Sequence, residues 1–332
     1  MLWNRIAGGK DRPERKRRSS RRCGKDEQLS RVVFIGAGAL GVMFGWQMTQ
    51  KLGREQVCFL ADEKRVARYE TESFSCNGAP CALRFTADAA AEGPAELVVF
   101  AVKFSGLPAA IELAWPLVGE GTALLSLLNG ISSEQMLIDA FGAEHVLYCV
   151  AQKMDAVKEG NAITYGHMGN LQIGLPGGGT SPLMERTLAL LTAGGVPYEL
   201  PEDILHSQWS KLMLNTGVNQ VTAAYGLSYA GIQKDGEPRR KMIAAMEEVR
   251  AVAAAEGVQL TEEEVRQWLI SLDGLNPEGM TSMRQDRKAG RRTEVELFSG
   301  TIRRLGQAHG IPTPVNDELY AAIRKAEEED AR

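Results

Sequence analysis

The chain has no run of about 18 consecutive apolar residues, which is the length that a membrane-spanning helix needs. Its five cysteines form no CxxC pair, and its four histidines are too dispersed to suggest a metal site. The formal net charge of -4 argues against a chain-wide basic surface for nucleic acid. We therefore expect no membrane, nucleic-acid or metal partner. Unpaired thiols are typical of a reducing compartment, which predicts a cytoplasmic protein.

Basic residues are concentrated in the first 29 residues, which include the run at 15–18 and the pair Arg21 and Arg22. This segment lacks the apolar stretch that follows the charges of a secretory signal. It fits either an arm for nucleic acid or a membrane surface, or a disordered extension. The disordered extension over 1–29 is favoured, because the rest of the chain is slightly acidic and carries no matching basic motif.

A strand, a glycine turn and a helix follow in the order of a nucleotide-binding unit. The length of 332 residues predicts two domains. Residues 31–35 form a β-branched run, and residues 42–52 have helical spacing. In such a turn the three glycines allow a sharp bend, leave room for a pyrophosphate and let helix and strand pack closely. The helix N-terminus adds free N–H groups for the phosphates. The expected cofactor-binding residues here are Gly36, Ala37, Gly38, Ala39, Leu40 and Gly41.

The end of the second predicted strand bears on the choice of cofactor. The apolar run at 57–61 ends at Asp62, 21 residues beyond Gly41. A carboxylate there would accept hydrogen bonds from a ribose 2′-hydroxyl and repel a 2′-phosphate, which favours NAD. Lys64 and Arg65 follow at once, and either cation can pair with that phosphate, which favours NADP. The residues alone leave the choice open.

Strands and helices alternate through the rest of the first half. Such alternation predicts a parallel sheet with helices on both faces. The expected fold is therefore α/β, with a Rossmann-type domain over residues 30–202. The apolar runs lie at 96–102, 122–128 and 146–150, and the helical stretches at 106–118 and 132–141.

Polar residues follow two of these predicted strands. Ligands of open sheets bind beyond the carboxyl ends of the strands, which is where Lys103, Asn129 and Gly130 fall. An Asn-Gly pair is also a common turn, so this pair has a purely structural interpretation as well. Ser132 and Gln135 have the spacing of a capping box at the start of the next helix.

The second half, residues 203–332, is rich in Ala, Met, Glu, Arg and Leu, which predicts an all-α domain. Lys211, Asn215 and Asn219 recur every four residues, so a helix would bring them to one face. One cation and two amides suit a keto acid, because the cation can pair with a carboxylate or protonate a carbonyl oxygen. A solvated helix face is the alternative.

A second stretch with polar groups runs from 279 to 300. Glu294 and Glu296 are expected in the first turns of a helix capped by Thr293, where acidic side chains also complement the helix dipole. Periodicity does not distinguish the two glutamates.

The motifs together resemble one family, the ketopantoate reductases, which are 2-dehydropantoate 2-reductases of pantothenate biosynthesis. The resemblance runs from about residue 31 into the C-terminal region, in one order and spacing. The motifs that carry it are GAGALG at 36–41, AVKFSGL, LLNGIS, WSKLMLNTGVNQVTAAYG, TSMRQD and RRTEVELFSGTIRRLGQAHGIPTPVN.

The resemblance implies a role for each matching residue. Lys211 corresponds to the catalytic lysine, the general acid that protonates the C2 oxygen, and Glu294 rather than Glu296 to the catalytic-site glutamate. A buried lysine suits that role, because desolvation lowers its pKa toward working pH. The remaining matches are Asn215, Asn219 and Ser282 in the substrate pocket, Lys103 and Asn129 beside the cofactor, and Ala156 in a backbone contact to it.

The resemblance also implies NADPH-dependent reduction of 2-dehydropantoate, with two departures. Asp62 stands where the family commonly has an arginine for the 2′-phosphate, whereas Arg65 matches another basic position, so NADP is favoured and NAD is the alternative. Gln220 replaces a proline, and Tyr229 lies near a missing asparagine of the pocket. A reductase of another small 2-keto acid and a non-enzymatic dinucleotide sensor are therefore kept as alternatives. A homodimer is possible, although no heptad pattern requires it.

Overall fold

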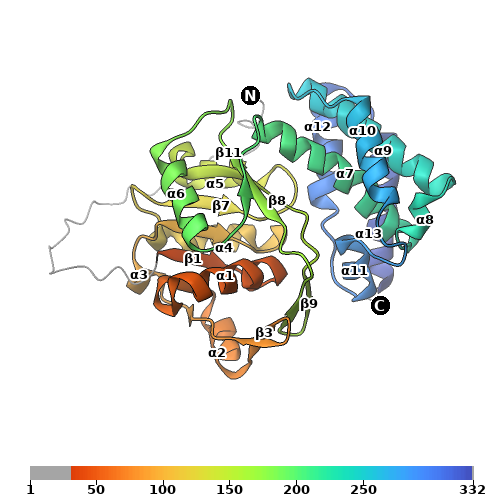
Figure 1. Ribbon diagram of the computed structural model, residues 1–332. Helices are drawn as coiled ribbons and strands as arrows, with labels where there is room; N and C mark the ends of the chain where they lie inside the picture. The colour runs from red at the N-terminus through yellow and green to blue at the C-terminus, as the bar shows by residue number, and fades with distance from the viewer. Residues whose placement is uncertain (1–30, 331–332) are drawn as a thin grey trace.

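The computed structural model describes residues 31–330, so the predicted extension at 1–29 lies outside the described residues. The chain forms a sheet flanked by helices, followed by a helical half (Figure 1). The long helix α7 (Ile204–Tyr225) leads from the sheet into the helical half and contacts strand β8 (Val146–Gln152) of the sheet. The predicted α/β class, with a parallel-rich sheet before an all-α region, is confirmed.

The main sheet has eight strands in the order β12-β11-β8-β7-β6-β1-β2-β5. All neighbours pair in parallel except β8 and β11, which are antiparallel. Besides β8, the strands are β1 (Val32–Ile35), β2 (Val57–Leu60), β5 (Phe85–Thr86), β6 (Leu97–Phe100), β7 (Ala123–Ser126), β11 (Asn170–Gly174) and β12 (Tyr198–Glu199).

Helices bury both faces of the sheet, which explains why its central strands are apolar throughout. In β1, Val32 and Phe34 face one core, while Val33 and Ile35 face the other. The first core includes side chains of α1 (Ala39–Leu52) and α6 (Pro182–Ala193). The second includes side chains of α3 (Ala89–Glu92), α4 (Leu107–Ala114) and α5 (Ser133–Phe141). A strand covered on both sides reads as one hydrophobic run.

A second, four-stranded sheet, which the sequence did not predict, has the order β4-β3-β10-β9. Its strands have three residues each and are joined by turns of glycine and asparagine. Segments this short show no strand pattern in the sequence. Helix α2 (Glu63–Thr71) lies between β2 and this sheet in the chain. The strands are β3 (Phe74–Cys76), β4 (Ala79–Cys81), β9 (Val157–Glu159) and β10 (Ala162–Thr164).

The helical half has its own core around α7 and α9. Asp203 caps α7, its Oδ1 accepting the backbone N–H of Leu205 at 2.9 Å and of His206 at 3.1 Å. Gly226 ends the helix in the left-handed conformation. The other elements are α8 (Ala230–Gln233), α9 (Glu237–Ala255), α10 (Glu262–Asp273), α11 (Ser282–Lys288), the π-helical turn η6 (Glu296–Gly300), α12 (Thr301–His309) and α13 (Pro314–Asp330).

Two predicted helix caps are wrong, although α5 does begin where it was expected, directly after Ser132. Ser132 precedes α5 but makes no side-chain cap, and the Gln135 amide instead donates to Asp139 at 2.8 Å, one turn further on. Thr293 does not cap a regular helix, because residues 291–294 are irregular and Val295 is the residue that precedes η6; the Thr293 hydroxyl donates to Glu327 at 2.6 Å and accepts the Val295 N–H at 3.4 Å.

Three findings concern membrane, thiol and metal chemistry within residues 31–330. No helix there is long and apolar enough to cross a bilayer. The four cysteines of this range, Cys58, Cys76, Cys81 and Cys149, are free thiols. No group of three or more histidine, cysteine or acidic side chains in this range is placed to hold a metal ion.

Candidate active site

The glycine turn after β1 is closely packed at its first and third glycines. Gly36 has φ +115°, and a Cβ there would lie 2.5 Å from the Ala101 carbonyl oxygen. A Cβ on Gly41 would lie 2.2 Å from the Gly36 carbonyl oxygen. Only glycine fits at either position, because no real Cβ approaches backbone so closely.

The middle glycine differs. A Cβ on Gly38 would meet the nearest protein atom, the Ala101 carbonyl oxygen, at 3.5 Å, which is ordinary contact. Gly38 also precedes α1 without any side-chain cap, so N–H groups of the first turn, at Ala39 and Leu40, point outward unpaired by a cap. Protein packing does not require glycine here, whereas a phosphate lying against the backbone does. The turn therefore fits a dinucleotide.

Lys158 of β9 reaches this turn from the second sheet. Its ammonium donates to the carbonyl oxygen of Ala37 at 2.5 Å and lies over the Phe74 ring, with Nζ 5.1 Å from the ring centroid. Burial lowers the pKa of Lys158, and the nearby Arg68 guanidinium acts in the same direction. The Lys158 ammonium, with the Arg68 guanidinium nearby, makes the region around the turn electropositive, as a phosphate site requires.

Asp62 and Arg65 both lie at the carboxyl end of β2, and they contact each other. The Asp62 carboxylate caps α2 by accepting the Arg65 backbone N–H at 2.8 Å, and it pairs with the Arg65 guanidinium at 3.4 Å. Both side chains are largely exposed. The acid therefore has a structural role as a helix cap, in addition to any contact with a ribose.

Lys103 lies just beyond β6 and connects the two halves of the molecule. Its ammonium forms an ion pair with Asp286 of α11, whose carboxylate also accepts from Arg291 at 2.9 Å. Asp286 is almost buried, so it is compensated by two cations. Ala156 lies in the segment between β8 and β9, partly buried against the core that supports the glycine turn.

Asn129 provides a second connection between the halves. Its side-chain amide donates to the Glu294 carboxylate at 2.9 Å. The following Gly130 has φ +86° and packs against Leu297 of η6. The Asn-Gly turn after β7 therefore faces the helical half rather than solvent.

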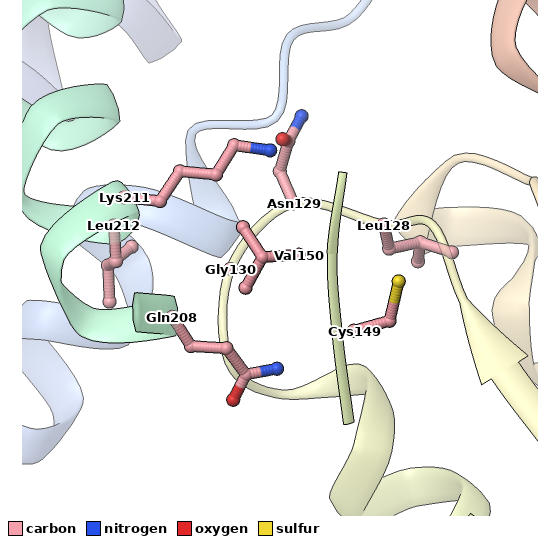
Figure 2. Close-up of a pocket in the computed structure, with 8 residues that line it drawn as sticks. All are labelled: Leu128, Asn129, Gly130, Cys149, Val150, Gln208, Lys211 and Leu212. Carbon is pink, nitrogen blue, oxygen red and sulfur yellow. The ribbon is translucent and has the colours of Figure 1, made fainter. Parts of the chain in front are cut away.

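Lys211 lies in α7 at this same boundary, where the two halves form a small pocket (Figure 2). Its ammonium donates to the carbonyl oxygen of Ala151 in β8, and Figure 2 shows it pointing toward Asn129. Burial lowers the pKa of Lys211 to about 8, while the Cys149 thiol and the Glu294 carboxylate act in the opposite direction. The pocket is lined by Leu128, Asn129, Gly130 and Cys149 from the sheet half and by Gln208 and Lys211 from α7.

The predicted face of α7 continues beyond Lys211. Asn219 donates to Asn215 at 3.4 Å, so the two amides are neighbours. Thr222 donates to the Asn219 carbonyl at 3.1 Å and lies 2.7 Å from the Thr281 hydroxyl, which caps α11. Ser282, the first residue of α11, is exposed. The structure thus brings Lys211, Asn215 and Asn219 onto one helix face, and Ser282 follows the threonine that contacts Thr222 one turn further on.

The sequence did not single out four residues of this region: Gln208, Cys149, Asp286 and Lys158. Gln208 precedes Lys211 by one turn, and Asp286 ends the motif TSMRQD. Their closeness in sequence to predicted site residues was therefore a usable signal. Lys158 and Cys149 had none, because their neighbours in space are distant in sequence.

A glycine turn of the dinucleotide-binding type in the sheet half, with a buried lysine and a glutamate that the helical half brings to the boundary, is the arrangement of a nucleotide-dependent oxidoreductase. The comparisons with known proteins name its family. Residues 32–177 match the family described as "Ketopantoate reductase PanE/ApbA", and residues 203–327 match its C-terminal part. The chain belongs to this ketopantoate reductase family, whose members are NAD(P)-dependent reductases.

Relatives match over almost their whole length. A 2-dehydropantoate 2-reductase of Caulobacter vibrioides is 26% identical over 298 residues, covering 90% of this chain and 99% of its own. The crystal structure of a PanE/ApbA family ketopantoate reductase from Ralstonia eutropha superposes with a TM-score of 0.79 at 27% identity, covering 91% and 100%. A D-mandelate dehydrogenase solved with NADH has the same fold, with a TM-score of 0.79 at 21% identity, covering 90% and 99%.

Proposed function

We propose that the chain reduces 2-dehydropantoate to pantoate with NADPH, as a step of pantothenate and coenzyme A biosynthesis. The observation that carries the proposal is the position of Lys211, which lies in the pocket between the halves with Asn129 and Glu294 beside it. A general acid must lie within reach of the oxygen that it protonates, and its pKa should be near working pH.

In the proposed reaction, the glycine turn and Ala156 hold the dinucleotide, with Lys103 and Asn129 beside it. When bound, the dinucleotide supplies the hydride that adds to C2 of the keto acid. Lys211 donates its proton to the C2 oxygen, so the alkoxide becomes a hydroxyl and the lysine becomes a neutral amine. A pKa of about 8 keeps Lys211 mostly protonated at neutral pH, yet makes it a better proton donor than an ordinary lysine.

We assign the substrate contacts to the polar face of α7 and the start of α11. Asn215 and Asn219 offer donors and acceptors for the carboxylate and hydroxyl groups of the substrate, and Ser282 adds a hydroxyl at the far end. Glu294 orients the site through Asn129 and supports the protonated form of Lys211.

NADPH is the proposed cofactor, with NADH as the alternative. Arg65 is exposed at the carboxyl end of β2, where its guanidinium is available to a 2′-phosphate. Asp62 already caps α2 and pairs with Arg65, so its charge is partly compensated. The D-mandelate dehydrogenase of the same fold, solved with NADH, is a precedent for the alternative.

A reductase of a different 2-keto acid is the second candidate, and the surroundings of Tyr229 favour it. The backbone N–H of Tyr229 donates to the Gly279 carbonyl at 3.0 Å, and a Cβ on Gly279 would lie 2.9 Å from the Tyr229 ring. An aromatic ring near the start of α11 suits a more apolar substrate. Gln220 does not support this candidate, because it is fully buried and bonds Ser299 and Thr216 within the core.

Steady-state oxidation of NADPH and NADH across a panel of 2-keto acids tests these alternatives. The proposal predicts the highest kcat/KM with 2-dehydropantoate and NADPH. Preference for another keto acid would support the second candidate. Tight dinucleotide binding without turnover on any of them would indicate a sensor. The homodimer stays a prediction, and light scattering of the full chain would test it.

A further inference from the structure

Glu134 is a buried carboxylate to which the proposed reaction gives no role. It is the second residue of α5 and is only 1% exposed. A buried charge is costly unless hydrogen bonds compensate it, so its partners indicate what it is for.

Neutral donors satisfy both oxygens of this carboxylate. Oε2 accepts from the Ser133 hydroxyl at 3.0 Å, and Ser133 in turn accepts from Ser126 of β7 at 2.8 Å. Oε1 accepts from the side-chain amide of Gln208 at 2.8 Å. The backbone of Glu134 itself and of Cys149 in β8 also hydrogen-bonds the carboxylate. The group is therefore a fully bonded centre on which β7, β8, α5 and α7 converge.

Gln208 connects this centre to the proposed proton donor. It lines the pocket, is 4% exposed, and precedes Lys211 by one turn of α7 (Figure 2). A carboxylate only accepts hydrogen bonds, so it must hold the nitrogen of the Gln208 amide, which fixes that side chain. Lys211 bonds the carbonyl of Ala151, two residues beyond Cys149 on the same strand. Helix α7 is thus fastened at two successive points, by Gln208 to Glu134 of α5 and by Lys211 to Ala151 of β8.

We propose that Glu134 is a positioning residue for Lys211: by holding Gln208 it fixes α7 to α5, and through the Cys149 backbone to β8, and so keeps the lysine ammonium in the pocket. The Lys211 ammonium must also serve the substrate, so its bond to Ala151 is not a fixed attachment of the helix. The Glu134–Gln208 bond is then the attachment that keeps this turn of α7 in place. The proposal rests on the proposed function only for its kinetic readout.

The charge state of Glu134 matters to this attachment. Burial raises the pKa of Glu134 to about 7, although its hydrogen bonds act in the opposite direction. The titratable groups on the elements packed against α5 are Tyr148 and Cys149 on β8, Lys211 on α7, exposed Glu112 and Glu144, and His145, which bonds the Thr122 carbonyl. A protonated carboxyl has a donor in place of an acceptor and holds the Gln208 nitrogen less well.

Competitive acetylation of the full-length chain with acetic anhydride, read by peptide mass spectrometry from pH 6 to 10, tests the proposal without any substrate. Glu134→Gln and Gln208→Leu are compared with Glu144→Gln, a matched control at an exposed glutamate. We expect Lys211 to titrate with a pKa of about 8 in the wild type and in the control. In both test variants the pKa of Lys211 should move back up toward that of an exposed lysine, so the smaller fraction of neutral amine should lower its labelling at pH 7 several-fold.

Kinetics supply the second arm. Misplacement of a catalytic group by about 1 Å costs on the order of 100-fold, so kcat should fall about 10- to 100-fold in Glu134→Gln and Gln208→Leu, with unchanged dinucleotide affinity. Because protonation of Glu134 loosens its bond to Gln208, kcat of the wild type should fall as the pH drops below about 7, the pKa of Glu134. This acid-side limb should be absent in Glu134→Gln.

An unchanged pKa of Lys211 in both variants would overturn the proposal. So would a joint loss of kcat, dinucleotide affinity and thermal stability, which indicates a general structural role. If only the proposed function is wrong, the wild type will show no turnover of 2-dehydropantoate, but the labelling of Lys211 will still change in the two test variants as expected.

Discussion

The Glu294 carboxylate accepts a hydrogen bond from the Asn129 amide at 2.9 Å, between residues 165 positions apart in the chain. Asn129 follows β7 of the sheet half, and Glu294 precedes η6 of the helical half. The same carboxylate acts electrostatically on Lys211 and raises its pKa against the effect of burial. The protonation of the proposed general acid therefore depends on a carboxylate that the nucleotide-binding half holds in place.

The first prediction concerns pH. Because a general acid must carry its proton, kcat of the wild type should fall as pH rises through about 8, the pKa of Lys211. In Glu294→Gln the negative charge is lost, so this alkaline limb should move to lower pH. Glu296→Gln is the matched control, since Glu296 bonds the Tyr320 hydroxyl at 2.5 Å instead. A kcat–pH profile of each enzyme measures the shift, and equal limbs in wild type and Glu294→Gln would contradict the assignment.

The second prediction separates the glycines of the turn by their function. Gly38→Ala should leave the melting temperature almost unchanged, because its Cβ meets protein only at 3.5 Å, but should weaken dinucleotide binding. A methyl group forced into a filled site costs roughly 1–3 kcal/mol, or about 10- to 100-fold in the dissociation constant.

Gly41→Ala is the comparison, because its Cβ would lie 2.2 Å from the Gly36 carbonyl oxygen. The same cost of roughly 1–3 kcal/mol then falls on the fold itself and lowers the melting temperature by several degrees. Thermal denaturation and dinucleotide fluorescence titration measure both effects. Normal binding by Gly38→Ala would mean that no phosphate lies against that backbone.

The third prediction concerns Lys158, whose ammonium lies 2.5 Å from the Ala37 carbonyl oxygen. An ammonium has three donors, so two remain for a phosphate at the turn. A charge-assisted hydrogen bond contributes about 1.5–3 kcal/mol, so Lys158→Met should weaken dinucleotide binding about 10- to 100-fold. Lys153→Met is the control, because Lys153 is exposed and pairs with Glu199. Equal dissociation constants for the two variants would remove Lys158 from the site.

Local patterns predicted the parts of the molecule that depend on neighbouring residues. The glycine turn and the three-residue face of α7 could be predicted because strand, turn and helical period fix them within about 20 residues. The predicted capping box at Ser132 failed because the Gln135 amide bonds Asp139, and the predicted cap at Thr293 failed because no regular helix begins there.

Contacts between distant segments had no such signal. Lys103 and Asp286 are 183 residues apart, and Ala37 and Lys158 are 121 apart. Nothing within either segment indicates the pairing, because the path of the chain through both halves brings them together. Glu134 reads as an ordinary acidic residue in the first turn of a helix. Only its burial distinguishes it from one.

The central claim is that Lys211 supplies the proton in a hydride-transfer reaction, and one comparison tests it most directly. Turnover of 2-dehydropantoate with saturating NADPH is measured for the wild type and for Lys211→Ala, with dinucleotide affinity measured in parallel. The account predicts that kcat falls about 10²- to 10⁴-fold while dinucleotide affinity is unchanged. A kcat within a few-fold of the wild type at saturating substrate would contradict it.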